Sequence, residues 1–107
     1  MGYVDTQGAR RRTLPRAEVH AVCLLTRHRG RPIEGETLDL GPGGMRVSTK
    51  RPLAVDELLT FDITLAAAEH IDGSARVVRE QAPNVYALRF ERLAPLAAGR
   101  LELIVAS

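Results

Sequence analysis

Residues 59–65, LTFDITL, alternate strictly between apolar and polar side chains. Successive side chains of a β-strand point to opposite faces, so this pattern puts every apolar residue of the segment on one side. Those residues are Leu59, Phe61, Ile63 and Leu65. The segment therefore predicts a half-buried antiparallel strand with one face on a core.

Five further strands are predicted from similar but weaker patterns. The first begins after Pro15, with Val19, Ala21, Cys23 and Leu25 on one face. The others span about 33–40 and 45–49, then pass through Ala75 and Val77, and through Tyr86, Leu88 and Phe90. Gly- and Pro-containing segments at 30–32, 41–44, 51–53 and 82–84 supply the turns.

The last segment has the periodicity of a helix. Pro95 suits the first turn of a helix. The apolar residues that recur at helical spacing are Leu96, Ala97, Leu101 and Ile104. Gly99 weakens such a helix by about 1 kcal/mol relative to Ala, so the helix must pack against the sheet. Six short strands and one helix predict a small all-β barrel, closed or half-closed, with a C-terminal helical plug.

The bulk composition fits one globular domain. The chain has 107 residues, of which 45% are hydrophobic and 26% are charged. Its single cysteine, Cys23, excludes an internal disulfide and lies in an apolar run, where a buried thiol is expected. No apolar run reaches the length of a membrane span, and residues 1–12 hold none that could act as a signal peptide. We therefore expect a cytoplasmic protein.

Arginine is concentrated in the first third of the chain. The residues are Arg10, Arg11, Arg12, Arg16, Arg27, Arg29 and Arg31, and the only acidic residues within residues 1–32 are Asp5 and Glu18. A run such as residues 10–16 is most often a solvated basic tail. However, guanidinium groups also bind phosphate in a bidentate manner and stack on flat rings, and Pro15 stiffens the approach of Arg16 to the barrel. An anion-binding surface is the alternative.

Residues 39–44, DLGPGG, also allow two interpretations. Gly and Pro are the usual residues of a hairpin turn. No Lys-Ser/Thr follows and the next element is a strand, so this is not a phosphate loop of the nucleotide-triphosphatase kind. Alternatively, the glycines let a ligand approach the backbone closely, with Asp39 accepting its hydrogen bonds.

Other chemistries find little support. His20, His28 and His70 match no metal-ligand spacing, and no serine has a nucleophile signature around it, so neither a metal site nor an enzyme is expected. Small basic barrels often bind nucleic acid, but they need exposed aromatic side chains for stacking. Here the aromatic residues other than Tyr3 fall on predicted core faces.

The order and separation of the two open segments resemble the signature of PilZ domains. That family has Arg-Arg-x-x-x-Arg before the first strand and Asp-x-Ser-x-x-Gly at a turn about two strands later. Residues 11–16, RRTLPR, match the first motif, and residues 39–44 match the second except that Gly41 replaces the serine. The resemblance continues through SARVVRE and VYALRFERL to the C-terminal helix. It implies a six-stranded antiparallel β-barrel of PilZ type over residues 11–107. Residues 1–10 are polar and have no periodicity, so a flexible tail is expected there.

The resemblance further implies binding of cyclic di-GMP, a bacterial second messenger with two phosphates and two guanines. By this resemblance, Arg12 and Arg16 contact phosphate and guanine, and Asp39 accepts hydrogen bonds from guanine N–H groups. Gly44 would give the backbone room. Arg11 is linked, in some members, to uptake of a stacked ligand dimer. No metal and no cofactor other than this ligand is expected.

Arg46 and Gly41 complete the predicted site. Strand alternation alone, not a family motif, places Arg46 beside the turn. Gly41 lacks the serine hydroxyl, and a lost hydrogen bond costs about 0.5–1.5 kcal/mol, or about 1.5–3 kcal/mol with a charged partner. That range corresponds to about three- to a hundredfold in affinity.

Two functional hypotheses follow. The first is a stand-alone cyclic di-GMP receptor and adaptor, in which the ligand draws residues 10–16 onto the barrel and so alters a surface for an effector protein. The second is a degenerate PilZ domain, with the same fold but no nucleotide, that serves only as a protein-interaction module.

Overall fold

The computed structural model describes residues 16–106, so the predicted tail, Arg11 and Arg12 lie outside the described residues. The described elements are β1 (Ala17–Glu18), β2 (Val22–Thr26), β3 (Ile33–Gly41), β4 (Gly44–Thr49), β5 (Leu58–Thr64), the 3-10 turn η1 (Ala66–Ala68), β6 (His70–Ala82), β7 (Val85–Leu93) and α2 (Pro95–Ala106).

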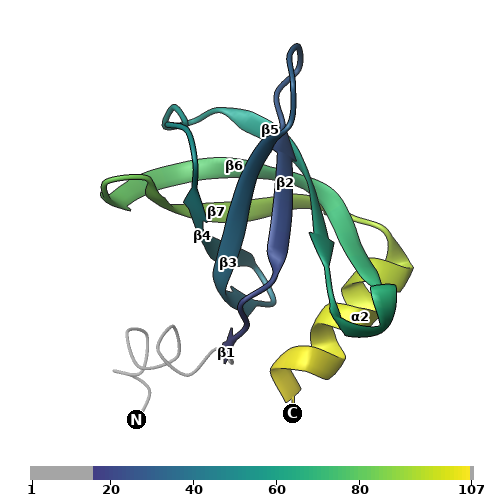
Figure 1. The fold of residues 1–107 in the computed structure, drawn as a ribbon. Coiled ribbons are helices and arrows are strands. Elements are labelled where there is room, and N and C mark those ends of the chain that lie inside the picture. Colours follow the sequence, from purple (N-terminus) through teal and green to yellow (C-terminus); the bar gives the residue numbers. More distant parts are fainter. Residues whose placement is uncertain (1–15, 107) are drawn as a thin grey trace, which may run out of the picture.

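Six of these strands close into an antiparallel barrel. They are hydrogen-bonded in the order β3–β2–β5–β6–β7–β4, and β4 pairs back with β3 to complete the ring. The short β1 adds to β3, where Ala17 pairs with Leu40. Figure 1 shows the strands crossing around a common interior, with α2 at one end of the barrel. The predicted six-stranded antiparallel barrel with a C-terminal helix is confirmed.

The apolar faces predicted from alternation form the core. On β5, Leu59, Phe61 and Ile63 are buried, while Leu65 lies just beyond the strand and is half-buried. Phe61 stacks on the half-buried Phe90 of β7, with ring centroids 5.2 Å apart. Each fully buried side chain of this size contributes roughly 1.5–3 kcal/mol to folding. The core therefore lies inside the ring, and the polar faces of the strands form the outer surface.

The first predicted strand is interrupted in the structure. Residues 19–21 separate β1 from β2. At this break the buried Thr37 of β3 donates its hydroxyl hydrogen to the Val19 carbonyl at 2.5 Å and accepts a hydrogen bond from the Ala21 amide at 3.0 Å. A side chain thus replaces part of the backbone ladder, which alternation in the sequence cannot reveal. Because of this break, β1 pairs separately with the end of β3, at Asp39 and Leu40.

Helix α2 packs through fewer residues than predicted. Ala97 and Leu101 are buried, and Ile104 is half-buried against the core. Leu96, predicted on this packed side, is 66% exposed. Ala97 and Leu101 lie one turn apart on the face toward the barrel, which turns Leu96 to its flank. Within residues 16–106, no helix combines the length and apolar character needed to cross a membrane.

Candidate functional site

Two arginines converge on Asp39. Its Oδ1 accepts hydrogen bonds from Arg16 Nε at 3.1 Å and from Arg16 Nη2 at 2.5 Å. Its Oδ2 accepts a hydrogen bond from Arg46 Nε at 2.6 Å. The Asp39 side chain is 15% exposed, whereas those of Arg16 and Arg46 are 44% and 43% exposed. Both guanidinium groups are therefore held in place by the carboxylate and remain open to a ligand from solvent.

A β-bulge places Asp39 and Arg46 on the same outer face. Thr37 of β3 pairs with Val47 of β4, but the next pair is Asp39 with Arg46, so Leu38 is one extra residue on β3. Thr37 is buried, and strict alternation from it would turn Asp39 inward as well. The extra residue instead brings Asp39 beside Arg46. Arg46, which strand alternation places beside the turn, thus contacts Asp39 directly in the structure.

Gly41 provides the space in which the Arg16 side chain lies. The pairing of Ala17 with Leu40 brings Arg16 alongside Gly41. A Cβ on residue 41 would be 2.7 Å from Arg16 Nη1 and 3.2 Å from its Cζ. The missing side chain therefore lets Arg16 cross β3 and reach Asp39. Sequence reasoning treats Gly41 only as a lost hydroxyl and does not find this role.

Gly44 is required by the barrel. Gly41 pairs with Gly44 across the two-residue turn of Pro42 and Gly43, which confirms the predicted hairpin turn. A Cβ on Gly44 would overlap the Leu88 carbonyl oxygen of β7. The room that was expected for a ligand at Gly44 is occupied by the β7 backbone. Gly43, where an added Cβ would have no atom within 4 Å, is the open glycine of the turn.

The pKa of Asp39 reflects both its burial and its partners. Burial raises the pKa of this carboxyl, but the hydrogen bonds and charges of Arg16 and Arg46 outweigh burial and hold the pKa below its ordinary value. A lowered pKa in the folded state means that the ionised group stabilises the fold above the unfolded pKa of about 3.9 and that this contribution is lost as pH falls further.

Asp39→Asn is accordingly expected to lower the free energy of unfolding at pH 6 by about 1 kcal/mol or less, because the partners are partly exposed. The difference from wild type should shrink below about pH 4, where the carboxyl of the unfolded wild-type chain takes up a proton before that of the folded chain does. Urea unfolding of both proteins between pH 3 and pH 7 measures this difference. A difference that stays constant over the whole range would contradict the assigned ion pairs.

Two open clefts flank the carboxylate. One, of about 470 Å³, is lined by Arg16, Asp39, Arg46 and residues of β1. The other, of about 380 Å³, is lined by the same three residues together with Met45, Arg79, Gln81, Ala87 and Leu88. Arg79 and Gln81 come from β6 and were not predicted. The pairing of β6 with β7 shifts register three times, and no feature of the sequence marks these shifts.

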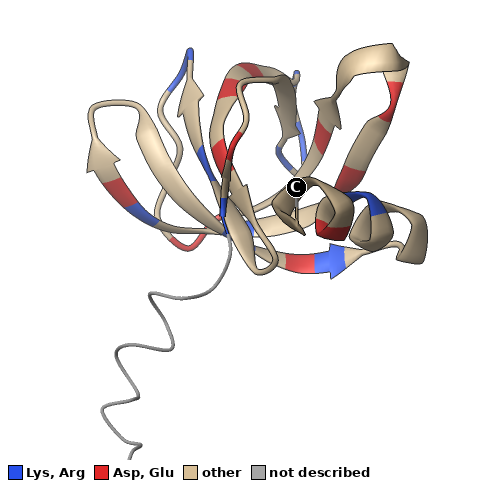
Figure 2. Cartoon of the chain, turned by 90° about the horizontal axis from the view of Figure 1, so that it is seen from below, with Lys and Arg blue, Asp and Glu red and all other residues tan. Residues whose placement is uncertain are grey.

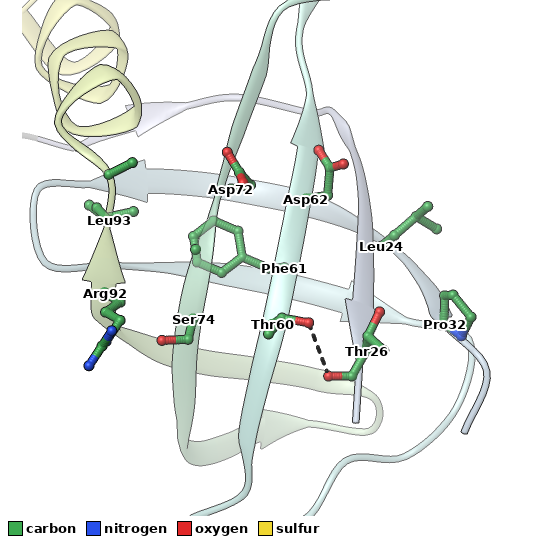
Figure 3. A pocket seen from close by; sticks show the side chains of 12 residues that line it. Leu24, Thr26, Pro32, Thr60, Phe61, Asp62, Asp72, Ser74, Arg92 and Leu93 are labelled. Carbon is green, nitrogen blue, oxygen red and sulfur yellow. Dashed lines mark hydrogen bonds between the residues drawn. The ribbon is translucent and has the colours of Figure 1, made fainter. Parts of the chain in front are cut away.

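A larger groove lies elsewhere on the barrel. It has a volume of about 810 Å³ and lies over β2, β5 and β6, close to the start of α2 (Figure 3). Asp62 and Asp72 line it and pair directly across β5 and β6, with Arg92 as the one cation of its lining. Two adjacent carboxylates repel an anionic ligand, so this groove is a poor site for phosphate. Figure 2 shows basic and acidic residues interspersed around the barrel, so charge alone does not identify a site.

The remaining titratable groups form small local pairs. Glu18 and His20 are 2.9 Å apart, and Asp62 and His70 are 2.7 Å apart. No group of three or more His, Cys, Asp or Glu residues in the described part of the chain is placed to hold a metal ion. Cys23 is buried as predicted, and burial raises the pKa of its thiol to about 12. At neutral pH this thiol is therefore protonated and unreactive.

The aromatic side chains also lie where alternation predicts. Phe61 and Tyr86 are buried and Phe90 is half-buried. Across residues 16–106, no aromatic side chain is therefore exposed as a platform on which single-stranded bases could stack.

Solved structures with the same fold include three similar chains. The Bacillus subtilis inhibitor of motility, MotI/DgrA, matches with a TM-score of 0.73 at 18% identity over 90% of this chain and 49% of that one. The chain thus spans about half the length of the Bacillus protein. The PilZ domain of YcgR from Escherichia coli, solved with c-di-GMP, matches with a TM-score of 0.73 at 15% identity, over 90% of this chain and 89% of that one. The PilZ domain of CeSA from a cellulose-synthesizing bacterium matches with a TM-score of 0.65 at 18% identity, over 85% of this chain and 94% of that one.

The sequence of the chain was also compared with curated proteins and with protein-family models. A search of curated protein sequences finds no significant match. The family model for the PilZ domain matches residues 10–107. That match includes both the arginine segment and the Asp39 turn, together with every strand of the barrel. The chain therefore belongs to the PilZ domain family.

Proposed function

We propose that this protein is a receptor for cyclic di-GMP, bound at Arg16, Asp39 and Arg46. The observation that carries the proposal is the convergence of both arginines on Asp39 beside the turn of residues 41–44. Membership of the PilZ family supports it, as does the similar fold of the YcgR domain, which was solved with c-di-GMP.

The chemistry of the ligand fits these side chains. A guanine presents O6 and N7 acceptors that a guanidinium group binds in a bidentate manner, and it presents N–H donors that a carboxylate accepts. In the structure, Arg16 and Asp39 satisfy each other. A guanine can replace this contact, since it offers an acceptor edge to Arg16 and a donor edge to Asp39. The phosphates then favour the same cationic surface.

Arg11 and Arg12 are within reach of the same site. Arg12 precedes Arg16 by four residues, and a fully extended chain spans at most about 3.3–3.6 Å per residue. The backbones of the two residues can therefore be no more than about 14 Å apart. We assign Arg12 to phosphate and guanine contacts, and Arg11 to a second, stacked ligand molecule.

The proposed output is an adaptor function. A ligand that binds Arg12 together with Arg16 would bring residues 11–16 against the barrel near β1 and the turn of residues 41–44. The ordered segment and the bound nucleotide would form a new surface for an effector protein. The contact between Arg16 and Asp39 supports this geometry, because it already fixes one end of the segment on the barrel.

Isothermal titration calorimetry of the wild-type chain with cyclic di-GMP tests the receptor function. We expect saturable binding, with GMP as a matched ligand that binds much more weakly because it offers one guanine and one phosphate. Undetectable heat at submillimolar cyclic di-GMP would exclude the proposal.

The alternative is a degenerate PilZ domain that binds no nucleotide, and Gly41 is the observation that favours it. Gly41→Ser separates the two functions. A serine would displace the Arg16 guanidinium group from its place across residue 41, as a ligand that engages Arg16 would also do, and it would supply the missing hydroxyl. In a working site we expect affinity to rise by about three- to a hundredfold, measured by calorimetry.

Gly43→Ser is the matched control for this experiment. It adds the same hydroxyl to the same turn, at a position where a Cβ meets nothing within 4 Å. Its affinity should equal that of wild type. An equal response to both substitutions would argue against a specific role of residue 41, and no binding by any of the three proteins would favour the degenerate domain.

A further inference from the structure

Four residues lie in one row across four neighbouring strands. Asp39 of β3 pairs with Arg46 of β4, and Arg46 pairs with Ala87 of β7. Ala87 in turn pairs with Arg79 of β6. All four line the cleft of about 380 Å³ beside the carboxylate. The row therefore continues the proposed nucleotide site beyond the two sequence motifs, onto strands that neither motif includes.

A second β-bulge turns Arg79 toward this cleft. Val77 pairs with Leu88, and both are buried in the core. The next pair is Arg79 with Ala87, so the exposed Val78 is one extra residue on β6. Strict alternation from Val77 would have pointed Arg79 into the core. Bulges of this kind commonly re-aim a side chain next to a functional site.

The charge of Arg79 is not used within the described part of the chain. Arg76, on the same strand, binds Glu91 at 2.8 Å, and Arg27 binds Glu57 at 2.5 Å. Among residues 16–106, by contrast, no carboxylate forms an ion pair with Arg79. Its cleft holds three guanidinium groups and the single carboxylate of Asp39. The cleft thus has an excess of cationic, planar groups.

The small side chain of Ala87 leaves a gap between Arg46 and Arg79. Neighbouring strands lie about 4.8 Å apart, so two strand spacings separate the backbones of these arginines by about 9.5 Å. Flat groups in contact lie about 3.5–4.0 Å apart. One planar ring with a guanidinium group on each face therefore needs about 7–8 Å, which the spacing of these two backbones allows. The buried Met45 and Leu88 also line this cleft.

We propose that Arg79 is a further ligand-binding residue, and that a guanine base of the dinucleotide stacks over Ala87 between Arg46 and Arg79. This inference rests on the proposed receptor function and extends it to β6 and β7. Stacking of a guanidinium group on a base requires a planar cation. Arg79 is thus expected to act through its shape as well as its charge.

Calorimetric titration of cyclic di-GMP into Arg79→Ala, Arg79→Lys and Ala87→Leu tests the inference. We expect Arg79→Ala to weaken binding by about five- to 150-fold, the range of one lost base-stacking contact. The affinity of Arg79→Lys should be close to that of Arg79→Ala, because lysine keeps the positive charge but lacks the planar guanidinium group. Ala87→Leu should also weaken binding, because it fills the gap without changing any charge.

Arg92→Ala is the matched control, since Arg92 lies on β7 in the same hairpin but lines the other groove. It should bind as wild type does, and thermal melts should show that all four variants are folded. Wild-type affinity in Arg79→Ala, or full recovery in Arg79→Lys, would overturn the stacking role while the receptor function stands. Absence of binding by the wild-type chain would overturn both.

Discussion

Arg16→Ala is expected to lower the affinity for cyclic di-GMP by about ten- to a hundredfold. Hydrogen bonds that involve a charged group contribute about 1.5–3 kcal/mol, and each 1.4 kcal/mol is tenfold in affinity. Arg16 is the residue that links the arginine motif to the turn, because it binds Asp39 and lies across Gly41. The change therefore removes a ligand contact and also the group that anchors residues 11–16 on the barrel.

The stability of the fold should hardly change in this variant. The Arg16 side chain is 44% exposed, and ion pairs that are open to water contribute at most about 1 kcal/mol. A large loss of affinity with an unchanged urea midpoint would thus locate the effect in binding. Arg12→Ala should weaken binding in the same way, which would test the part of the motif that precedes the described residues.

Arg31→Ala provides the control for net charge. Arg31 is exposed in the connection between β2 and β3, outside both clefts beside Asp39. Calorimetry at one fixed salt concentration should show wild-type affinity for this variant. If Arg12→Ala and Arg16→Ala also bound like wild type, the proposed site would be wrong.

Gly44→Ala is expected to destabilise the fold by at least about 1–3 kcal/mol, the usual cost of overpacking a closely packed site. A Cβ at this position would overlap the Leu88 carbonyl oxygen and lie 3.2 Å from the Leu88 carbonyl carbon. Both are backbone atoms of β7, so no side-chain rotation can relieve the contact. The substitution pushes β4 away from β7, at the pair of strands beside the turn.

Urea unfolding measures this effect, with Gly43→Ala as the control. Gly43 is the neighbouring glycine in the same turn, and an added Cβ there meets nothing within 4 Å. Its unfolding midpoint should stay near that of wild type. Equal stability of Gly44→Ala and Gly43→Ala would show that β4 and β7 can separate locally at little cost. It would also favour the interpretation of Gly44 as room for a ligand.

The strands and the helix could be predicted because their signal is local. Side chains that face a core must repeat every second residue along a strand, and the segment from Leu59 to Leu65 keeps that period without interruption. Pro95 and the helical spacing after it are equally local, and α2 begins at that residue. The prediction for Leu96 is wrong because spacing alone selects a broad face of a helix. In the structure only a narrower part of that face, which carries Ala97 and Leu101, is buried against the barrel.

The candidate site could be predicted only in part, for a related reason. Asp39, Gly41, Gly44 and the arginines are recognisable because they occur in two short motifs. Which face each residue occupies depends on bulges at Thr37/Asp39 and at Val77/Arg79, and a bulge is defined by the partner strand. Without that partner, Arg79 looks like an ordinary strand residue.

The amino-acid sequence alone thus predicts an antiparallel β-barrel with a terminal helix, and it predicts Arg16 and Asp39 as site residues. It does so because burial imposes a period on the chain and because turns need particular residues. The contacts among Arg16, Gly41 and Asp39, the close approach of Gly44 to β7 and the addition of Arg79 depend on registers between strands far apart in the chain. Registers follow from ring closure, and a single extra residue in one strand reverses the face of all that follow.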